Sequence, residues 1–539
     1  MFRLDLQSLR GDIFGGLTAA VVALPLALAF GVASGAGAIA GLYGAIAVGF
    51  FAAVCGGTPA QVSGPTGPMT VVMGAIVAQH SGNLAEAFTI VFFGGVMQIV
   101  FGLLRLGRYI AYTPYSVVSG FMTGIGVILI LIQTLPFFGL PTAAGGPVGA
   151  ILAWPGIPAS LNADALAVAS LALAIMLFWP GRLRTIVPPP LAALILGTLA
   201  GLFLVPEAPV IGDVPTGLPA LVMPDIVAGN LPRVVQGAFT LALLGSIDSL
   251  LTSLIADTIT RTRHNSDREL VGQGIGNVIA GLIGGLPGAG ATMRTVVNVR
   301  AGGTTPLSGA IHASILFALV LGLGPLAERV PHAALAGILL KVGWDIIDWA
   351  YLRRMRNAPR DKLFVMTVTF LLTVFVDLIT AVAVGIILAS FVTARWMERE
   401  ELKGVTKLAL TNGKDELTGK ELRLLKKVDG RVAVIRLRGS FSYASAREFA
   451  NMVSAEATGH SVIVYDFTDT AHMDTSMALT VDALLEQAAE QNVVCIVAGL
   501  AGTALKTLEG LKVLQRITPA HRFSTRLQAI KAAVKLTGR

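Results

Sequence analysis

Two ionisable residues lie where an apolar sequence is expected to carry none. Asp248 stands in the middle of the run "FTLALLGSIDSLLTSLIADTIT", and Thr252, one helical turn later, shares its face. Arg294 follows the glycines and the proline of "GGLPGAGATMRTVVN". An ionisable group inside a membrane points to function by default. Asp248 and Arg294, the latter beside an interrupted helix, are therefore the first candidates for a functional site.

A carboxylate at such a depth must be paired, protonated or bound to a cation. The Asp248 carboxylate, the Thr252 hydroxyl and backbone carbonyls at Gly290 and Thr292 would supply hard oxygen ligands, which suit Na⁺. The same carboxylate can instead hold a proton, since burial disfavours its charged form. A third interpretation is that Asp248 only neutralises Arg294.

A second interrupted segment, "GGTPAQVSGPTGPMTVV" at Gly56–Val72, resembles the one that contains Arg294. Apolar segments begin near residues 13 and 235, and the same offset of about 222 residues superposes the two interrupted segments. Both follow an apolar run and lead into a short apolar helix. Seven spans in each half is an odd number, so the halves have opposite topology, and matching breaks in inverted repeats indicate a transporter's central site.

Two short helices that begin at the membrane midplane would direct their N–H groups at a shared point. Each helix N-terminus carries roughly +0.5 charge, which attracts an anion. The expected anion site is formed by the backbone and side chains of Thr66, Gly67, Met69, Ala291, Thr292, Met293 and Arg294. The alternatives are that the threonines are helix caps and that Arg294 snorkels or forms a structural pair.

The composition places most of the chain in a membrane. The 539 residues are 54% hydrophobic and only 13% charged, against about 25% charged in soluble domains. The net charge of +8 does not indicate nucleic-acid binding, because the basic residues lie mostly in short loops between apolar runs. The two cysteines, Cys55 and Cys495, predict neither a disulfide framework nor a metal site.

About fourteen membrane spans are expected before residue 395. The first lies near Ile13–Ala33 and is retained rather than cleaved as a leader; the last lies near Ala381–Ala394. The third, "GPMTVVMGAIVAQH", is too short to cross a bilayer. Basic residues gather in alternate loops, for example at Arg105 and Arg108, whereas Pro136–Asp164 has neither lysine nor arginine. This pattern predicts that both termini are cytoplasmic.

The composition changes between about residues 395 and 405, which predicts a transport domain at 1–398 and a second domain at 399–539. The second domain alternates strand and helix patterns, as in "RVAVIRLRGS" and "SMALTVDALLEQAAE", so a small α/β fold is expected. It has no glycine-rich phosphate loop, no His/Cys cluster and no nucleophile elbow, so the chain is not expected to be an enzyme. Asp474, Thr475 and Ser476 lie at a strand-to-helix turn, where an N-cap explains them.

The chain resembles the SulP family of anion permeases over nearly its whole length, and its C-terminal part looks like the STAS domain of that family. The stretches that carry the resemblance are "RGDIFGGLTAAVVALPLALAFGVASGAGA", "PTGPMTVVM", "TRTRHNS" and "GAGATM". Within the family the chain is most similar to the sodium-dependent bicarbonate transporters. The resemblance implies two intertwined seven-span inverted repeats, arranged as gate and core domains, and a homodimer formed through the STAS domain.

The resemblance also assigns residues. Thr66, Ala291 and Thr292 match bicarbonate-site positions, and Asp248, Thr252, Gly290 and Thr292 match sodium-site positions. Ser476 falls where stand-alone STAS regulators are phosphorylated. Arg294 departs from the bicarbonate transporters, which have glycine there, and resembles the sulfate permeases, whereas Leu26 replaces the glutamine that is typical of sulfate permeases.

The function expected from the sequence is secondary active transport of a small inorganic anion across the cell (inner) membrane by alternating access. Bicarbonate with Na⁺ as the coupling ion is the leading pair, with no other cofactor. The alternatives are a sulfate permease coupled to H⁺ through Asp248, an uncoupled anion channel, and a sensor that reports through the STAS domain.

Overall fold

The structure is a computed structural model of the chain. It describes residues 6–80, 83–110, 114–143, 145–181, 183, 187–205, 207–212, 219–224, 230–355, 359–376, 378–408, 417–428, 430–457 and 459–538. The chain divides into two compact units, Met1–Ala389 and Ser390–Arg539. Helix α18, Leu378–Leu402, runs through the division and also contains the predicted domain boundary at residues 398 and 399.

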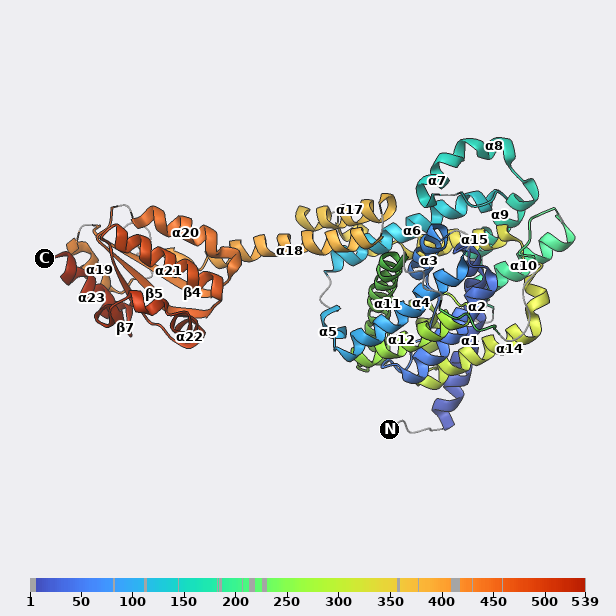
Figure 1. The fold of residues 1–539 in the computed structure, drawn as a ribbon, viewed down its shortest axis with the longest axis horizontal. Helices are drawn as coiled ribbons and strands as arrows, with labels where there is room; N and C mark the ends of the chain where they lie inside the picture. Colours follow the sequence, from blue (N-terminus) through green and yellow to red (C-terminus); the bar gives the residue numbers. More distant parts are fainter. Residues whose placement is uncertain are drawn as a thin grey trace. The chain divides into compact units, whose positions relative to one another are not determined.

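The first unit is a bundle of helices (Figure 1). Fourteen of its described helices have nine or more residues. They are α1 Leu6–Ala33, α2 Ala38–Cys55, α3 Gly67–Gln79, α4 Leu84–Leu103, α6 Tyr115–Phe137, α9 Ala163–Phe178, α10 Pro189–Phe203, α11 Leu231–Thr260, α12 Ser266–Leu282, α13 Thr292–Arg300, α14 Pro306–Ala327, α15 His332–Ile346, α17 Arg360–Phe375 and α18.

Six of these helices, α1, α2, α4, α6, α11 and α18, are individually long and apolar enough to cross a membrane. Helix α3 has 13 residues and α13 has nine, whereas a span needs about 20. Both therefore end inside the bundle rather than crossing it alone. The shorter described helices of this unit are α5 Gly107–Ile110, α7 Gly146–Ala153, α8 Ile157–Ser160 and α16 Trp349–Met355.

The packing of the first unit supports the predicted repeat. Helix α1 packs against α14 as α11 packs against α4, and α2 packs against α14 as α12 packs against α4. Helix α6 packs against α17 as α15 packs against α9. In each comparison, the second helix pair is the counterpart of the first when the two halves of the sequence are exchanged. Two intertwined copies of one unit would pack in this way. The number of complete spans and the symmetry of the repeat stay predictions.

The outside of this bundle is apolar. Large hydrophobic side chains such as those of Leu103, Phe178 and Phe203 are at least 70% exposed. Exposed apolar patches of this kind mark a surface that another apolar phase covers. On a bundle with six helices able to cross a bilayer, that phase is lipid.

The second unit is the predicted α/β domain. Its five-stranded sheet has the order β3-β4-β5-β6-β7, with β3 antiparallel to β4 and the other neighbours parallel. The strands are β3 Val405–Lys407, β4 Val432–Phe441, β5 Val462–Met473, β6 Val494–Ala498 and β7 Arg522–Phe523. The described helices of nine or fewer residues here are α19 Gly419–Leu425 and α22 Gly502–Gly510; the longer ones are α20 Tyr443–Ala457, α21 Thr475–Glu490 and α23 Arg526–Thr537.

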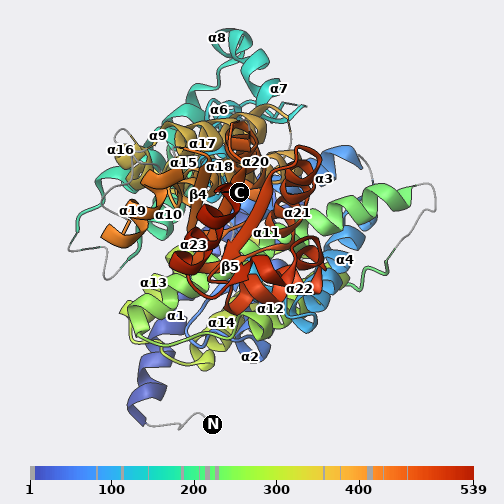
Figure 2. The ribbon, with the colours of Figure 1, turned by 90° about the vertical axis from the view of Figure 1, so that its left-hand side faces the viewer.

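Side chains alternate between the two faces of this sheet. On β5, Ile463 and Tyr465 join a core with α20, α21 and α22, whereas Val462 and Val464 join a second core with α19 and α23. Figures 1 and 2 show these helices around the sheet. Both faces are therefore covered, as an apolar, mostly parallel sheet requires.

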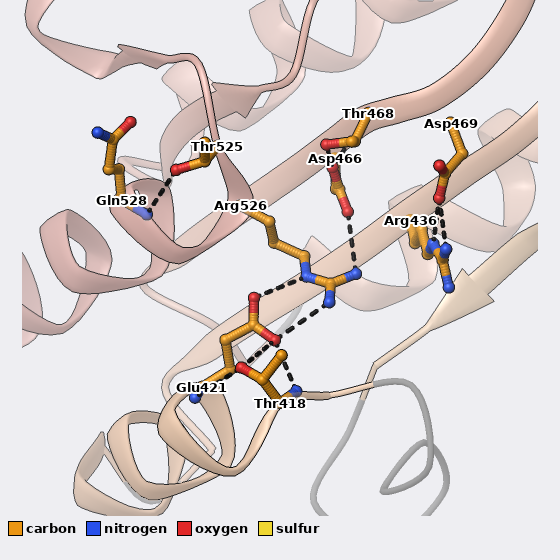
Figure 3. A network of polar contacts seen from close by, with 9 residues as sticks. All are labelled: Thr418, Glu421, Arg436, Asp466, Thr468, Asp469, Thr525, Arg526 and Gln528. Atoms are coloured by element: carbon orange, nitrogen blue, oxygen red, sulfur yellow. Dashed lines mark hydrogen bonds and ion pairs between the residues drawn. The ribbon is translucent and has the colours of Figure 1, made fainter.

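A half-buried arginine connects the second face to its helices (Figure 3). Arg526, the first residue of α23, donates to both carboxylate oxygens of Glu421 at 3.0 and 3.1 Å and to Asp466 Oδ2 at 3.2 Å. Burial would raise the pKa of Glu421, but hydrogen bonds from Arg526 and Thr418 outweigh burial and lower it. The cluster joins α19, α23 and β5 in one charge-assisted network.

Candidate functional site

The two interrupted segments meet in the centre of the first unit. Strand β1, Ser63–Gly64, pairs antiparallel with β2, Ala289–Gly290, with Ser63 opposite Gly290. The Ala291 N–H extends this pairing by donating to the Val62 carbonyl at 2.9 Å. The pairing satisfies backbone groups that would otherwise be unpaired within the bilayer. It also places the starts of α3 and α13 on adjoining strands.

The two helix starts differ in how they are capped. The Met69 N–H is 3.5 Å from Thr66 Oγ1, so Thr66 is the N-cap of α3, but Ala291 at the N-cap of α13 has no side chain that can cap. The first N–H groups of a helix have no partner within the helix. Met293 is 64% exposed and its side chain leaves the site, so it offers only its backbone N–H.

Thr66 also connects α3 to α11. Its hydroxyl donates to Asp248 Oδ2 at 2.8 Å. Asp248 is 8% exposed, and this hydrogen bond places its carboxylate next to the N-terminal end of α3. A hydroxyl has one proton to donate. In this arrangement Thr66 therefore orients Asp248, and the donors left for an anion are backbone N–H groups and Arg294.

Thr252 joins α11 to the start of α13. Its Oγ1 donates to the Gly290 carbonyl at 2.9 Å and is 2.8 Å from Thr292 Oγ1. Because the Thr252 proton goes to the carbonyl, the Thr292 hydroxyl is the donor in the second contact. Ser249 accepts from the Gly290 N–H at 3.0 Å. The structure thus gathers the oxygens of Thr252, Gly290 and Thr292 one turn from Asp248.

Arg294 connects the two helix starts. Its side chain is 3% exposed, and Nη2 donates to the Pro65 carbonyl, directly before α3. Asp248 and Arg294 attract one another but form no direct ion pair among the described residues. Gly64 has a φ of 149°, and a Cβ there would lie 2.7 Å from Arg294 Nη1. The positive φ favours glycine at this position, and a side chain there would also displace the Arg294 guanidinium.

A buried carboxylate that sequence reasoning missed supports this arrangement. Glu269 on α12 accepts from the backbone N–H groups of Gly57 and Thr58 at 2.9 and 2.8 Å. Its other oxygen accepts from the side-chain amides of Gln61 and Gln273, both at 2.8 Å. Four donors hold one carboxylate, as a buried charge requires. Glu269 thereby positions the chain that runs from α2 into β1.

Two further contacts extend this polar layer. Gln273 donates to Ser63 Oγ on β1 at 2.6 Å, and Asn277 exchanges hydrogen bonds of 3.0 and 2.8 Å with the backbone of Gly288 just before β2. Glu269, Gln273 and Asn277 recur at every fourth position of α12. That stripe of polar residues in an apolar segment is the signal from which the sequence could have revealed the layer.

The strand-to-helix turn at Asp474 in the second unit forms a helix N-cap. Asp474 Oδ1 accepts from the Met477 N–H at 2.8 Å and is the N-cap of α21, as predicted. Ser476 is exposed in the first turn. Its phosphorylation stays a prediction.

Comparison with known proteins gives a consistent result for both units. Residues 9–369 match the sulfate permease family, and residues 423–529 match the STAS domain. The chain is 42% identical to the bicarbonate transporter BicA of Picosynechococcus sp., covering 99% of this chain and 96% of that protein. It is 32% identical to the putative sulfate transporter YvdB of Bacillus subtilis, covering 71% of this chain and 73% of that protein. The structure of the transmembrane domain of a cyanobacterial BicA superposes with a TM-score of 0.66 at 49% identity, covering 70% of this chain and 98% of that one.

Proposed function

The chain belongs to the sulfate permease family and is a transport protein rather than an enzyme, and we propose that it carries bicarbonate into the cell together with Na⁺. The observation that carries this proposal is the joining of the α3 and α13 starts by β1 and β2, next to Asp248. Helix ends that converge inside a membrane bundle form an anion site, and a neighbouring carboxylate offers a cation site.

The similarity to named transporters supports bicarbonate over sulfate. A relative that is 42% identical over 99% of this chain is a bicarbonate transporter, whereas the putative sulfate transporter is 32% identical over 71%. In the proposed complex the anion accepts hydrogen bonds from the first-turn N–H groups of α3 and α13. The buried Arg294 guanidinium adds positive charge from one side.

The oxygen atoms around Thr252 support sodium as the coupling ion. The Asp248 carboxylate, two threonine hydroxyls and the Gly290 carbonyl are hard ligands of the kind that small cations prefer. A bound Na⁺ would tie α11 to the start of α13, where Thr252 already connects them. It would thereby fix the helix N-terminus that the anion needs, which couples the two ligands.

The proposed mechanism is alternating access. The short helices and α11 form a core, and α6 and α15 belong to the opposing gate. A Cβ on Gly67 would lie 2.5 Å from Ile346 Cδ1, so the start of α3 directly contacts the end of α15. Movement of the core past α15 would expose the site first to one side and then to the other. We further propose an inner-membrane location, cytoplasmic termini and a homodimer formed through the STAS domain.

Sulfate with H⁺ is the second candidate, and Arg294 is the observation that favours it. A full positive charge between the helix ends suits a divalent anion better than glycine would. Uptake of radiolabelled bicarbonate and sulfate into proteoliposomes decides between the two. The proposal predicts bicarbonate uptake that rises with external Na⁺ and little sulfate uptake. Sulfate uptake that is indifferent to Na⁺ would overturn it.

A further inference from the structure

A cluster of exposed arginines lies where two helices able to cross a membrane end next to one another. Two arginines follow the last residue of α4 and two follow the last residue of α11: Arg105, Arg108, Arg261 and Arg263. The two ends adjoin because the Gly107 N–H, between the first pair, donates to Asp267 Oδ1 at 3.1 Å in the first turn of α12. Helix α5, which begins at Gly107, accordingly packs against both α11 and α12 (Figure 1). These four residues are the arginine cluster.

The loop between α11 and α12 holds the backbone of its two arginines in a fixed shape. Asp257, in the last turn of α11, accepts from the His264 N–H at 3.0 Å and from the Thr262 hydroxyl at 3.2 Å. Its carboxylate is also 2.7 Å from His264 Nδ1, and His264 Nε2 is 2.9 Å from Ser266 Oγ at the start of α12. The backbone that presents the two arginines is therefore ordered before a ligand binds, which lowers the entropic cost of binding.

The positive charge of the cluster is not taken up by ion pairs. Asp257 is occupied within the loop, and Asp267 accepts from the start of α5. No described carboxylate forms an ion pair with Arg105, Arg261 or Arg263. The guanidinium group presents several N–H donors that match the oxygens of a phosphate group. The arginine cluster therefore offers an anion site at the ends of two membrane helices.

The backbone is strained at the first arginine of each pair. Arg105 and Arg261 have φ values of 58° and 56°, and they are the only residues other than glycine with positive φ in the described part of the first unit. Each ends its helix: the Leu106 N–H closes α4 on the Phe101 carbonyl at 2.9 Å, and Arg261 is the C-cap of α11. Glycine adopts this conformation freely, whereas other residues do so at a cost. The positive-inside pattern explains basic residues on this side but not arginine where glycine fits better, so the strain indicates a function for the two side chains.

The arginine cluster borders apolar surface that faces lipid. The exposed side chains directly before it are Leu103 and Leu104 at the end of α4, and Ile255 and Ile259 in the last turns of α11. A soluble anion contacts the arginines alone. An anionic phospholipid matches both features, because its phosphate binds the guanidinium groups while its acyl chains cover the leucines and isoleucines. Basic groups on the cytoplasmic side, where the proposed orientation places this cluster, attract such lipids.

We propose that the arginine cluster is a binding site for an anionic phospholipid, whose phosphodiester accepts hydrogen bonds from guanidinium groups at both helix ends. Its acyl chains lie along Leu103 and Ile259. The bound lipid joins the end of α4 to the end of α11, the helix that carries Asp248, and so stabilises this part of the bundle. The inference does not depend on which anion or coupling ion the protein transports.

The test measures the thermal unfolding midpoint of the full chain, purified in a neutral detergent, as short-chain phosphatidylglycerol is added. A ligand that binds only the folded protein raises this midpoint. Phosphatidylcholine with the same acyl chains, and glycerol phosphate without chains, should raise it little. Each arginine near an anionic headgroup contributes about 5-fold to binding, so Arg105→Gln/Arg261→Gln should raise the half-saturating phosphatidylglycerol concentration by about 25-fold.

Arg353→Gln/Arg354→Gln is the matched control, since it removes two exposed arginines from α16, outside the cluster. It should leave the half-saturating concentration unchanged. The inference is overturned if this control weakens binding as much as Arg105→Gln/Arg261→Gln does, because the effect then reflects net charge alone. It is also overturned if phosphatidylcholine, or glycerol phosphate alone, stabilises the protein as well as phosphatidylglycerol does.

A glycine variant separates lipid binding from folding. Because glycine adopts the left-handed conformation without strain, Arg105→Gly/Arg261→Gly should unfold at the same or a higher temperature than the wild type when no lipid is added. It should still need about 25-fold more phosphatidylglycerol for half-saturation. A lower lipid-free midpoint together with an unchanged phosphatidylglycerol requirement would show that the two arginines only cap their helices, and would overturn the inference.

Discussion

Replacing Thr252 by valine removes one hydroxyl and keeps the shape of the side chain. Thr252 is fully buried, and its Oγ1 contacts the Gly290 carbonyl at 2.9 Å and Thr292 Oγ1 at 2.8 Å. In the valine variant both partners lose a contact inside the bundle. Leaving a buried polar group unsatisfied costs about 1–3 kcal/mol. The start of α13 should therefore be held less firmly to α11.

The same hydroxyl is one of the proposed sodium ligands, so the loss should appear as weaker sodium dependence. A cost of about 1.4–2.8 kcal/mol corresponds to a 10- to 100-fold increase in the Na⁺ concentration that gives half-maximal bicarbonate uptake. The maximal rate should return at high Na⁺, because the anion site keeps its backbone donors. The assay is initial uptake of labelled bicarbonate into proteoliposomes over a series of external Na⁺ concentrations.

Thr369→Val is the control for this experiment. Thr369 is also fully buried, but its hydroxyl donates to the Val365 carbonyl of its own helix at 2.8 Å, in α17. It should leave the half-maximal Na⁺ concentration unchanged. An unchanged value in Thr252→Val, or the same increase in both variants, would refute a sodium site at Thr252.

Three further outcomes are expected. Asp248→Asn keeps an oxygen for the Thr66 hydroxyl but loses the charge, so Na⁺-driven bicarbonate uptake should disappear from a protein that still folds; full gradient-driven uptake would contradict the coupling role. Arg294→Gly should change the ratio of bicarbonate to sulfate uptake more than it changes expression. An unaltered ratio would mean that Arg294 only connects the two helix starts through its hydrogen bond to the Pro65 carbonyl. In the STAS domain, the lowered pKa of Glu421 means that its paired carboxylate stabilises the fold at neutral pH and that this contribution is lost as pH falls below about 4.5. Glu421→Gln should therefore lower the opening free energy of α23, measured by hydrogen exchange at pH 7, by about 1–2 kcal/mol. Between pH 7 and pH 4 the variant should lose less of this opening free energy than the wild type does, and an equal loss in both proteins would contradict this.

The features that sequence reasoning predicted well are those set by local pattern. The lengths of the apolar runs predicted the long helices, and the glycine–proline breaks predicted the short helices that follow Thr66 and Ala291. Strand and helix alternation gave the α/β fold of the second unit. Asp474 as an N-cap follows from its residue type and position alone.

The features that sequence reasoning missed depend on contacts between distant segments. Nothing local indicates that Arg294 donates to the Pro65 carbonyl rather than pairing directly with Asp248, since their segments meet only through the β1–β2 pairing. The two-residue strands are too short for any periodic signal. Glu269 carries a pattern on α12, but its donors at Gly57 and Thr58 lie more than 200 residues away in the sequence.

Concentrative uptake tests the central claim most directly. Proteoliposomes that contain the full chain receive equal bicarbonate on both sides and an inward Na⁺ gradient, with the membrane potential clamped. Coupling at Asp248 and Thr252 predicts that labelled bicarbonate accumulates above its external concentration and that the accumulation disappears when the Na⁺ gradient is removed. Equilibration without accumulation, at the same rate with and without the gradient, would contradict the account.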